Sequence, residues 1–494
     1  MKNFTRRALL LGSGAALGVA GTKYLKSSNP VLDGTKTLQP GWGEDSLNDA
    51  SELSQTPIHK HIILKDDPGQ ALVKALRAEL KDAAADNRPV NIGAARHSMG
   101  AQAIPRDGHA ITFDNGLVET DTAKATYRAH AGARWAQVIA AIDPQGFSPA
   151  VMQSNHDFGV AATFCVNAHG WPVPYGPMGA TVQNFKMLLA DGELVACSRH
   201  QNTDLFNLTM GGYGLTGLIT EMQVDMVPNQ RLEPTFKKLP GEQLGTAFMQ
   251  ALSDKSVTMA YGRLNVDREN FMHDALMITY RAAADQSDLP PASGSGFMSK
   301  VAGKIYRAQL GNERMKRVRW FTETDLGPRL AGASTRNSLI NEPVVTLDDG
   351  NPNRVDILHE YFVAPERFPE FLQVCRDVIP ASYQEFLNVT LRFINTDSES
   401  LLAYAAVPRI AAVMSFSQEL TARAEADMAR MTHALIDGII GIGGSYYLPY
   451  RPHASLDQLL RAYPRAAKFA AAKRAIDPDL RFRNNLWDTY LGAL

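Results

Sequence analysis

The sequence predicts an α+β fold of two or three packed units, in which a first domain of mixed strands and helices is capped by a second. The chain has 494 residues, whereas single domains usually run to roughly 100–200 residues. Its 45% hydrophobic and 20% charged residues match a soluble globular protein that buries a sizeable core. Strand-like and helix-like segments alternate up to about residue 225, and the pattern changes from about residue 232.

Charge and cysteine content exclude several classes of protein. The 50 basic and 51 acidic residues give a formal net charge of -1, so we expect no nucleic-acid partner. Cys165, Cys197 and Cys375 are widely spaced and fit neither a disulfide framework nor a zinc site. We interpret them as small buried hydrophobic residues and assign no metal ligand, with one disulfide left open if the protein works outside the cytoplasm.

The first residues have the pattern of an export signal. Within residues 1–25, Arg6 and Arg7 stand directly before an apolar run over 8–20. That run is shorter than the roughly 20 apolar residues of a spanning helix. Paired arginines before such a run are typical of twin-arginine export, which resembles the route of bacterial proteins that acquire a cofactor before crossing. We predict the twin-arginine machinery as a partner and a periplasmic or exported location; an ordinary Sec signal or an uncleaved membrane attachment is the alternative.

The elements of the first domain follow in order. Residues 26–51, rich in Ser, Pro, Gly and Asp, are predicted to form a linker or extended arm. Apolar residues at helical spacing predict an amphipathic helix over 68–84, and a short strand over 89–93 comes next. Further strands are predicted at 110–113, 127–131, 185–190 and 218–224, with a helix near 135–142.

The second domain is expected over residues 231–445, as a cap on the first. A breaker-rich stretch at 285–296 interrupts it. The remaining predicted elements are a strand at 355–363 and a helix at 365–378 in the cap, then a strand at 446–448 and a helix at 466–476 in the last segment, residues 446–494.

Three clusters of small residues suggest a cofactor site. Residues 91–100 indicate a strand followed by small residues and a His-Ser pair, where backbone N–H groups would close on phosphate oxygens. Residues 151–170 again place small residues beside polar ones, so that a flat cofactor edge or a diphosphate would approach the backbone closely. Residues 211–220 are dense in glycine, but they lack a P-loop lysine and open no helix, which disfavours nucleotide triphosphates. Taken singly, each cluster also fits an ordinary tight turn.

Together, in this order and spacing, the clusters resemble the FAD-binding domain of the vanillyl-alcohol oxidase and p-cresol methylhydroxylase superfamily, and especially its bacterial sugar-lactone and alditol oxidases. The resemblance spans about residues 45–230 and returns at 476–478 and 482–484. It implies a two-subdomain FAD-binding domain over 52–230, an α+β cap (substrate) domain with an antiparallel sheet, and a C-terminal segment that returns to the FAD domain.

The resemblance also implies which residues bind FAD. His97 stands where many members bond the flavin covalently; the alternative is the same histidine packed noncovalently against the isoalloxazine ring. Asn155 stands where doubly linked members carry a cysteine, so we predict one link. Alanine replaces the usual glycine at several of these positions, at little cost in space. The pyrophosphate would contact Gly93, Ala94, Ala95, Arg96 and Ser98; the rest of the cofactor would contact Ser154, Ala162, Thr163, Asn167, His169 and Gly170, with Gly217 and Ile219 on the adenine side.

Several residues are implied to act on the substrate. Arg392 lies in a segment similar to a cap-domain strand of alditol and lactone oxidases, and it would orient the substrate and stabilise the reduced flavin. The relatives' glutamate two residues earlier is Thr390 here, which argues against a polyol substrate. Arg451 and His453 lie in a segment similar to the relatives' Arg-Pro-His-Trp, and His453 would accept the hydroxyl proton. The alternatives are that Arg451 pairs with a surface Glu or Asp and that His453 is a structural histidine at a domain junction. Glu360, in a strand-like cap segment, is a lower-ranked alternative base.

We therefore predict an FAD-dependent oxidase or dehydrogenase that removes hydride from a hydroxyl-bearing carbon of a small-molecule substrate: a sugar, sugar lactone or alcohol. Oxygen, a quinone or a cytochrome would take the electrons, and Ala168, which this family places at the flavin edge, favours a dehydrogenase. Two alternatives remain: a flavin-dependent reductase of carbon–carbon double bonds, and a flavin-carrying binding or electron-transfer protein without a working substrate pocket.

Overall fold

The computed structural model describes residues 45–293, 297–343 and 351–494. The predicted signal, residues 1–25, and most of the predicted linker lie outside the described residues. The described chain begins with an antiparallel ribbon of two short strands, β1 (Ser46–Leu47) and β2 (Thr56–Pro57). Within the described ranges, no helix combines the length and the apolar character needed to span a bilayer.

A three-stranded parallel sheet carries the first predicted elements. Its order is β3 (Lys60–Leu64), β5 (His109–Phe113) and β4 (Val90–Gly93). Helix α2 (Gln70–Ala85) connects β3 to β4 and buries its apolar stripe, including Leu72, Leu76 and Leu80. The predicted helix and strand are thus confirmed with slightly shifted ends. Because the pairing is parallel, the C-terminal ends of β4 and β5 meet at one edge of the sheet, and their N-terminal ends meet at the other.

A six-stranded antiparallel sheet completes the first half of the molecule. Its order is β10-β9-β11-β7-β6, and β8 pairs with the end of β11 (Leu218–Pro228). The predicted strands and the predicted helix of this half are all present. The remaining elements are β6 (Val118–Asp121), β7 (Thr126–His130), β8 (Phe147–Pro149), β9 (Val182–Leu188), β10 (Leu194–Ser198), α3 (Trp135–Ile142), α4 (Val160–Cys165) and α5 (Thr203–Thr209).

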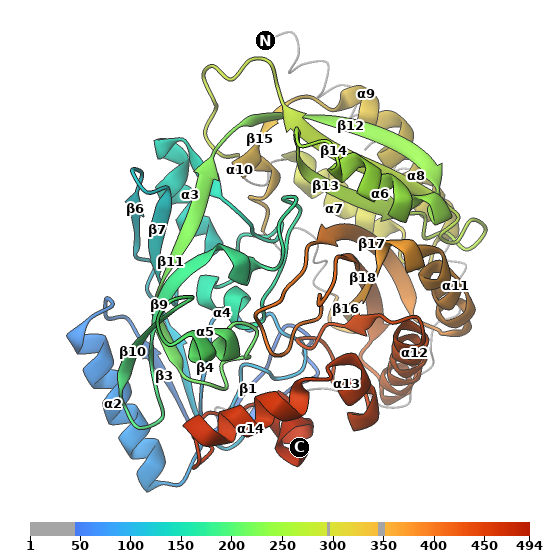
Figure 1. The fold of residues 1–494 in the computed structure, drawn as a ribbon. Helices are drawn as coiled ribbons and strands as arrows, with labels where there is room; N and C mark the ends of the chain where they lie inside the picture. Colours follow the sequence, from blue (N-terminus) through green and yellow to red (C-terminus); the bar gives the residue numbers. More distant parts are fainter. Residues whose placement is uncertain (1–44, 294–296, 344–350) are drawn as a thin grey trace.

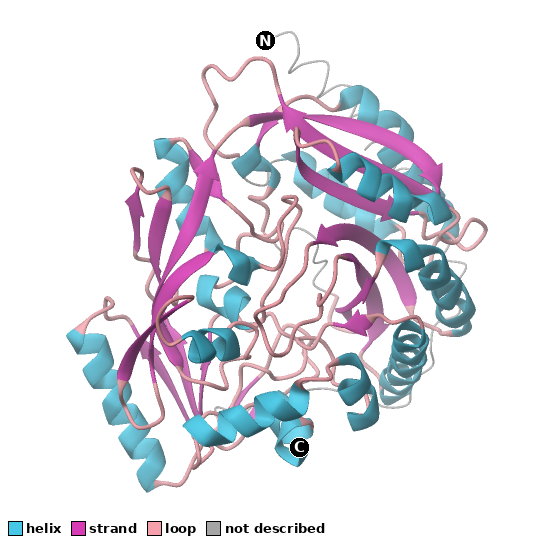
Figure 2. Cartoon of the chain, viewed as in Figure 1, coloured by secondary structure: helices cyan, strands magenta, loops and turns pink. Residues whose placement is uncertain are grey.

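An eight-stranded, wholly antiparallel sheet forms the second half, in agreement with the sheet expected of the cap (Figure 1). Its order is β15-β12-β14-β13-β17-β18-β16-β19, and α11 and α12 lie along its outer side (Figures 1 and 2). The strands are β12 (Arg231–Pro240), β13 (Val257–Leu264), β14 (Asp274–Ala282), β15 (Ser334–Thr335), β16 (Arg354–Val363), β17 (Glu385–Ile394), β18 (Arg409–Glu419) and β19 (Ser445–Tyr446). The helices are α6 (Leu244–Leu252), α7 (Phe297–Ala308), α8 (Glu313–Phe321), α9 (Gly327–Leu330), α10 (Arg336–Leu339), α11 (Phe368–Val378) and α12 (Ala422–Gly441).

The C-terminal segment returns from the cap to the first half. It contains α13 (Leu456–Ala462), α14 (Ala466–Ile476) and α15 (Asn485–Thr489), and α14 has the predicted bounds. Phe482 then forms an isolated parallel bridge with Val90 at the start of β4. The Asn484 side chain donates hydrogen bonds to two backbone oxygens of the first half, at 2.8 and 2.9 Å. In Figure 1 this red segment accordingly lies beside the blue N-terminal elements.

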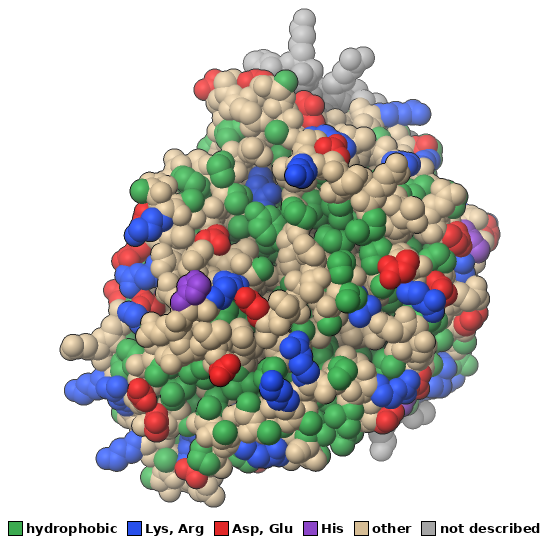
Figure 3. All heavy atoms as spheres, viewed as in Figure 1, with side chains coloured by type: hydrophobic (Ala, Val, Ile, Leu, Met, Phe, Trp, Pro, Cys, Tyr) green, Lys and Arg blue, Asp and Glu red, His purple; other side chains and the backbone are tan. Residues whose placement is uncertain are grey.

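Two large apolar cores hold the halves together. One fills the space between the cap sheet, its helices and the C-terminal helices, and the other packs α2 and the two sheets of the first half against part of the cap sheet. On the face drawn in Figure 3, basic and acidic side chains are interspersed and form no patch of one sign. The cavity that is lined by most of the predicted site residues lies between these two cores.

Candidate active site

A cavity of about 220 Å³ lies where the first half, the cap sheet and the C-terminal segment meet. The first half contributes the loop after β4, the region of α4 and the start of β11. The cap contributes side chains of β16, β17 and β18, and the C-terminal segment contributes Tyr447, Pro449 and Tyr450. The three predicted clusters of small residues thus meet in one wall, although more than 100 residues separate the first from the third.

The loop over residues 94–98 forms one end of this cavity. Its residues and Gly93 all line the wall. Within the described part of the chain, no protein group accepts a hydrogen bond from the backbone N–H groups of residues 94–98. Gly159, one of the small residues of the second cluster, lets that cluster approach this loop, because a Cβ there would lie 2.5 Å from Ala94 Cβ. Unpaired N–H groups at a cavity wall bind anions readily.

Arg96 places an unpaired cation beside that loop. Its backbone is left-handed, with φ of 51°, and its guanidinium folds back over Gly93. One nitrogen donates to Thr112 Oγ1 at 2.9 Å, whereas Nε has no partner and no carboxylate among the described residues pairs with the side chain. Burial, and secondly the charge of Arg134, lower the pKa of Arg96 to about 10. A buried guanidinium of this kind calls for an anionic ligand.

His97 lines the same end of the cavity. Its ring lies against that of Phe158, with 4.2 Å between the centroids. Burial lowers the pKa of His97, an effect that the charge of Asp157 opposes and that of Arg134 reinforces. The imidazole is therefore neutral at neutral pH, and one ring nitrogen keeps a free lone pair.

Only some residues of the second predicted cluster line the cavity. Ala162, Thr163 and His169 line the wall, whereas Ser154, Asn167 and Gly170 stand behind it. The Asn167 side chain donates to Asp397 and Ser400 and accepts from the Gly179 N–H, all at 2.8–3.0 Å, so it joins two loops. Gly170 is required by packing, since a Cβ would lie 1.9 Å from Met152 O.

The third cluster reaches the cavity through the predicted Gly217 and Ile219 and also through Tyr213 and Gly214. A Cβ on Gly217 would lie 2.9 Å from Leu188 O, so the glycine allows β11 to start close to its neighbour β9. Nearby, the amide of Asn91 on β4 is almost fully buried, and neither its oxygen nor its nitrogen has a partner. No sequence pattern assigns a role to Asn91.

Arg392, Glu360, Tyr450 and His169 form a polar group in the cavity wall. Glu360 has one carboxylate oxygen in contact with His169 Nε2, and the other accepts from the Tyr450 hydroxyl at 3.3 Å. Arg392 donates to His169 O at 3.3 Å and leaves its Nε unpartnered. Burial lowers the pKa of Arg392, and the charge of Glu360 opposes that effect. No ion pair joins Arg392 to any carboxylate in the described ranges, so a gap remains between cation and carboxylate.

Arg451 and His453 do not line the cavity. Both bind the carboxylate of Glu425 on α12, at 2.6 and 2.9 Å. Burial alone would raise the pKa of Glu425, but the hydrogen bonds and charges of His453 and Arg451 outweigh it and hold that pKa well below its usual value. The pair therefore joins the C-terminal segment to the cap helix.

Strand alternation explains why Glu360 rather than its neighbour His359 reaches the cavity. On β16, Leu358 and Glu360 face the cavity, whereas His359 points to the other face and contacts Thr432 of α12, which also binds His453. A glutamate inside a mainly apolar run, residues 357–363, is the sequence signal that marks Glu360 for a function. For Tyr450 and Asn91 the sequence carries no comparable signal.

Comparison with known proteins finds a family match within the first half. Residues 72–198 match the family described as FAD binding domain. The chain is similar to cytokinin dehydrogenase 7 of Oryza sativa subsp. japonica (26% identity, covering 49% of this chain and 39% of the relative). It is also similar to an alditol oxidase of Streptomyces sp. (30%, covering 28% and 33%) and to the mitochondrial L-galactono-1,4-lactone dehydrogenase 1 of rice (27%, covering 39% and 33%). The matches span at most about two fifths of these relatives.

The residues of the cavity fit such a cofactor. The free N–H groups of residues 94–98 and the unpaired Arg96 suit a diphosphate. Buried polar atoms without partners continue along the wall at Gln153, His169 and Arg392. Since buried polar groups are almost always hydrogen-bonded in folded proteins, these orphaned atoms indicate a polar ligand along the length of the cavity.

Proposed function

We propose that this chain, which belongs to the superfamily of FAD-dependent oxidoreductases, oxidises a hydroxyl-bearing carbon of a small molecule such as a sugar, a sugar lactone or another alcohol. The bound FAD supplies the chemistry of hydride acceptance. The observation that carries the proposal is Glu360, a buried carboxylate that lines the cavity beside the unpaired Arg392. A base and a cation separated by a gap suit a neutral hydroxyl compound that bridges them.

Glu360 is the group we assign to take the hydroxyl proton. Its oxygens are oriented by His169 and Tyr450, and each keeps a further lone pair for a hydroxyl in the cavity. Burial raises the pKa of Tyr450 well above its ordinary value, and the charge of Glu360 adds to that effect, so the phenol stays protonated as a donor. A general base in hydrogen-bond reach contributes typically about 10²–10⁴ to the rate.

Arg392 is the group we assign to orient the substrate. Arg392 is half-buried in the cavity wall and its buried Nε has no partner, so a hydrogen bond from this guanidinium to a substrate oxygen is stronger than one in bulk water. The same positive charge would stabilise negative charge that develops on the cofactor during reduction. Thr390, two residues earlier on β17, accepts a hydrogen bond from Arg263 at 2.6 Å and brings no carboxylate to Arg392.

Anaerobic spectroscopy of the flavin tests this function. The purified full-length protein is mixed with a panel of sugars, sugar lactones, simple alcohols and a cytokinin, since the relatives include a cytokinin dehydrogenase. We expect a hydroxyl compound to bleach the flavin absorbance. In Glu360→Gln, bleaching should slow about 10²–10⁴-fold with unchanged flavin content. Glu233→Gln, at an exposed position on β12, is the matched control.

A different outcome would identify another function. Bleaching by the cytokinin alone would assign oxidation of a different donor. Bleaching by a nicotinamide and reoxidation by an unsaturated compound would assign the double-bond reductase. A stable flavin that no compound bleaches would assign an electron carrier.

We further propose that His97 bonds the flavin covalently. The support is a neutral imidazole that lines the cavity, together with Asn155 in place of a second linking residue. Acid precipitation of the protein should give a yellow pellet, and intact mass should exceed the chain by one FAD. The His97→Ala variant should bind FAD but release it into the supernatant. A colourless wild-type pellet would mean that His97 packs against the flavin without a bond.

The electron acceptor and the location are also proposals. Oxygen, a quinone or a cytochrome would reoxidise the flavin, and Ala168 in the cavity wall favours one of the latter two over oxygen. The Arg6-Arg7 pair supports export through the twin-arginine machinery. Fractionation of cells that express the full chain should place the protein in the periplasm or at the membrane, and Arg6→Lys with Arg7→Lys should retain it in the cytoplasm.

A further inference from the structure

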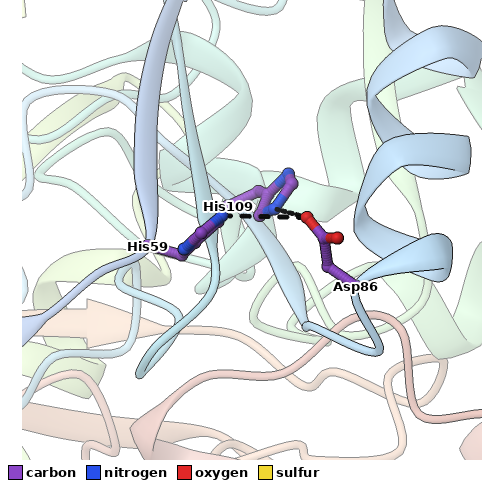
Figure 4. Close-up of side chains that lie close together, drawn as sticks. All are labelled: His59, Asp86 and His109. Atoms are coloured by element: carbon purple, nitrogen blue, oxygen red, sulfur yellow. Dashed lines mark ion pairs between the residues drawn. The ribbon is translucent and has the colours of Figure 1, made fainter.

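Two histidines and an aspartate meet at the edge of the parallel sheet remote from the loop over residues 94–98. His59 directly precedes β3, His109 is the first residue of β5, and Asp86 follows the last residue of α2 (Figure 4). The loop begins at the C-terminal end of β4, whereas these three residues lie at N-terminal strand ends. The cluster therefore takes no part in the proposed function.

His109 is held in the orientation and tautomer of a metal ligand. It is 1% exposed, and its Nδ1 lies 2.6 Å from Glu79 Oε1 on α2. Because the carboxylate accepts, Nδ1 carries the proton, and Nε2 keeps a lone pair. That Nε2 is buried and has no hydrogen-bond partner. A carboxylate behind one ring nitrogen, with the other free, is the usual support of a metal-binding histidine.

The free nitrogen of His109 points toward two further ligand atoms. Asp86 Oδ2 lies 3.9 Å from His109 Nε2 and 3.7 Å from His59 Nε2, and the three ligand atoms all lie within 4.8 Å of one another. Tetrahedral zinc, with bonds of about 2.0–2.2 Å, needs ligand atoms about 3.3 Å apart. The side chains of His59 and Asp86 are 41% and 51% exposed, so they are free to rotate inward by the small distance required.

The charges around the cluster favour a cation. Asp86 is the C-cap of α2, and the negative end of that helix dipole adds to its carboxylate. Glu79 is shared with Lys60, whose ammonium lies 2.8 Å from Glu79 Oε2 and 3.8 Å from Asp82. Three carboxylates therefore stand near the two imidazoles, against two cations, Lys60 and Arg88, whose guanidinium donates to Asp107 O at 2.6 Å.

We propose that His59, Asp86 and His109 bind a divalent transition-metal ion, with water as the fourth ligand and zinc as the expected ion. Two imidazoles and one carboxylate suit zinc and its neighbours in the first transition row, whereas Mg²⁺ and Ca²⁺ prefer oxygen ligands. The ion ties the segment before β3, the end of α2 and the start of β5 to one another. Because β5 continues into the cavity wall at Phe113, the site stabilises the sheet that carries the cofactor loop.

Calorimetric titration of the full-length, flavin-containing protein with ZnCl₂ tests this site. We expect one zinc ion per chain and a higher midpoint of thermal unfolding with zinc than without it. Removing an outer partner typically weakens metal binding about 10–100-fold. His59→Gln and Asp86→Asn each remove a direct ligand, so each should weaken zinc binding by at least the same factor. Both positions are exposed, so the variants should fold.

His200→Gln, which removes another exposed histidine, is the matched control and should bind zinc like the wild type. MgCl₂ should neither bind with comparable affinity nor displace zinc. The proposal is wrong if the wild type takes up no stoichiometric zinc, if both ligand variants bind zinc as tightly as His200→Gln, or if Mg²⁺ competes on equal terms. Flavin content and turnover do not enter these measurements, so the outcome is independent of the proposed function.

Discussion

Arg96 gives the sharpest test of the cofactor site, because its removal should stabilise the flavin-free protein while weakening flavin binding. Burial lowers the pKa of Arg96 from 12.5 to about 10. For a base, a folded pKa below the unfolded one means that folding disfavours the charged form. At any pH below about 10 the side chain is charged in both states, so the folded protein carries the full penalty at neutral pH.

The size of this effect follows from the pKa. The lowering corresponds to about 3 kcal/mol, at about 1.4 kcal/mol per pH unit. In Arg96→Met, the lost hydrogen bond to Thr112 offsets about 1 kcal/mol of that gain, and water in the cavity reduces it further. We expect the flavin-free variant to be about 1–2 kcal/mol more stable than its parent. Loss of charge-assisted hydrogen bonds of about 1.5–3 kcal/mol should raise the flavin Kd about 10- to 150-fold.

The assay uses the His97→Ala background, in which the flavin is exchangeable. Urea unfolding of the flavin-free protein gives the stability, and fluorescence titration with FAD gives Kd. Arg106→Met, at an exposed arginine, is the control and should change neither quantity. If Arg96→Met lowers the stability of the flavin-free protein, or leaves the Kd for FAD unchanged, the inference that Arg96 binds an anionic group of the cofactor is wrong.

Three further predictions concern stability and reactivity. Asn167→Ala should destabilise the protein by about 2–4 kcal/mol, because it leaves buried hydrogen-bonding partners unsatisfied. Asn202, the control, also has a left-handed backbone but is exposed, so Asn202→Ala should destabilise by only about 1 kcal/mol in the same thermal-unfolding assay. The pKa of Glu425 is lower in the folded than in the unfolded protein, so the carboxylate stabilises the fold by about 2 kcal/mol above its ordinary pKa of 4.5, and this stabilisation is lost as pH falls through the folded pKa. In urea unfolding across pH, Glu425→Gln should therefore lose less stability in acid than the wild type does, and parallel pH curves would contradict this. Burial raises the thiol pKa of Cys165 to about 12 and that of Cys197 to about 11, and it also raises that of Cys375. Ellman's reagent at pH 8 should therefore label fewer than one thiol per native chain, but all three after denaturation.

Features that depend on neighbouring residues were predictable from the sequence. The amphipathic helix over Gln70–Ala85, the strand before the first cluster and the loop of small residues follow from periodicity and side-chain size within a few residues. His97 and the residues around it line the cavity because the loop itself sets their directions. The FAD-binding domain was predicted from the family resemblance of the three clusters together, and the family match over residues 72–198 supports it.

Contacts between distant segments were decided only by the tertiary structure. Glu360, Arg392 and Tyr450 come from two strands and the C-terminal segment, and their meeting depends on the order and register of the cap sheet. The same register turns His359 toward α12, where Glu425 holds Arg451 and His453 outside the cavity. His59, Asp86 and His109 likewise carry no common pattern in sequence, and only the parallel pairing of β3 with β5 brings them together. A local sequence pattern predicts the structure and the functional groups of its own segment, whereas the packing of the sheets determines which segments form a site together.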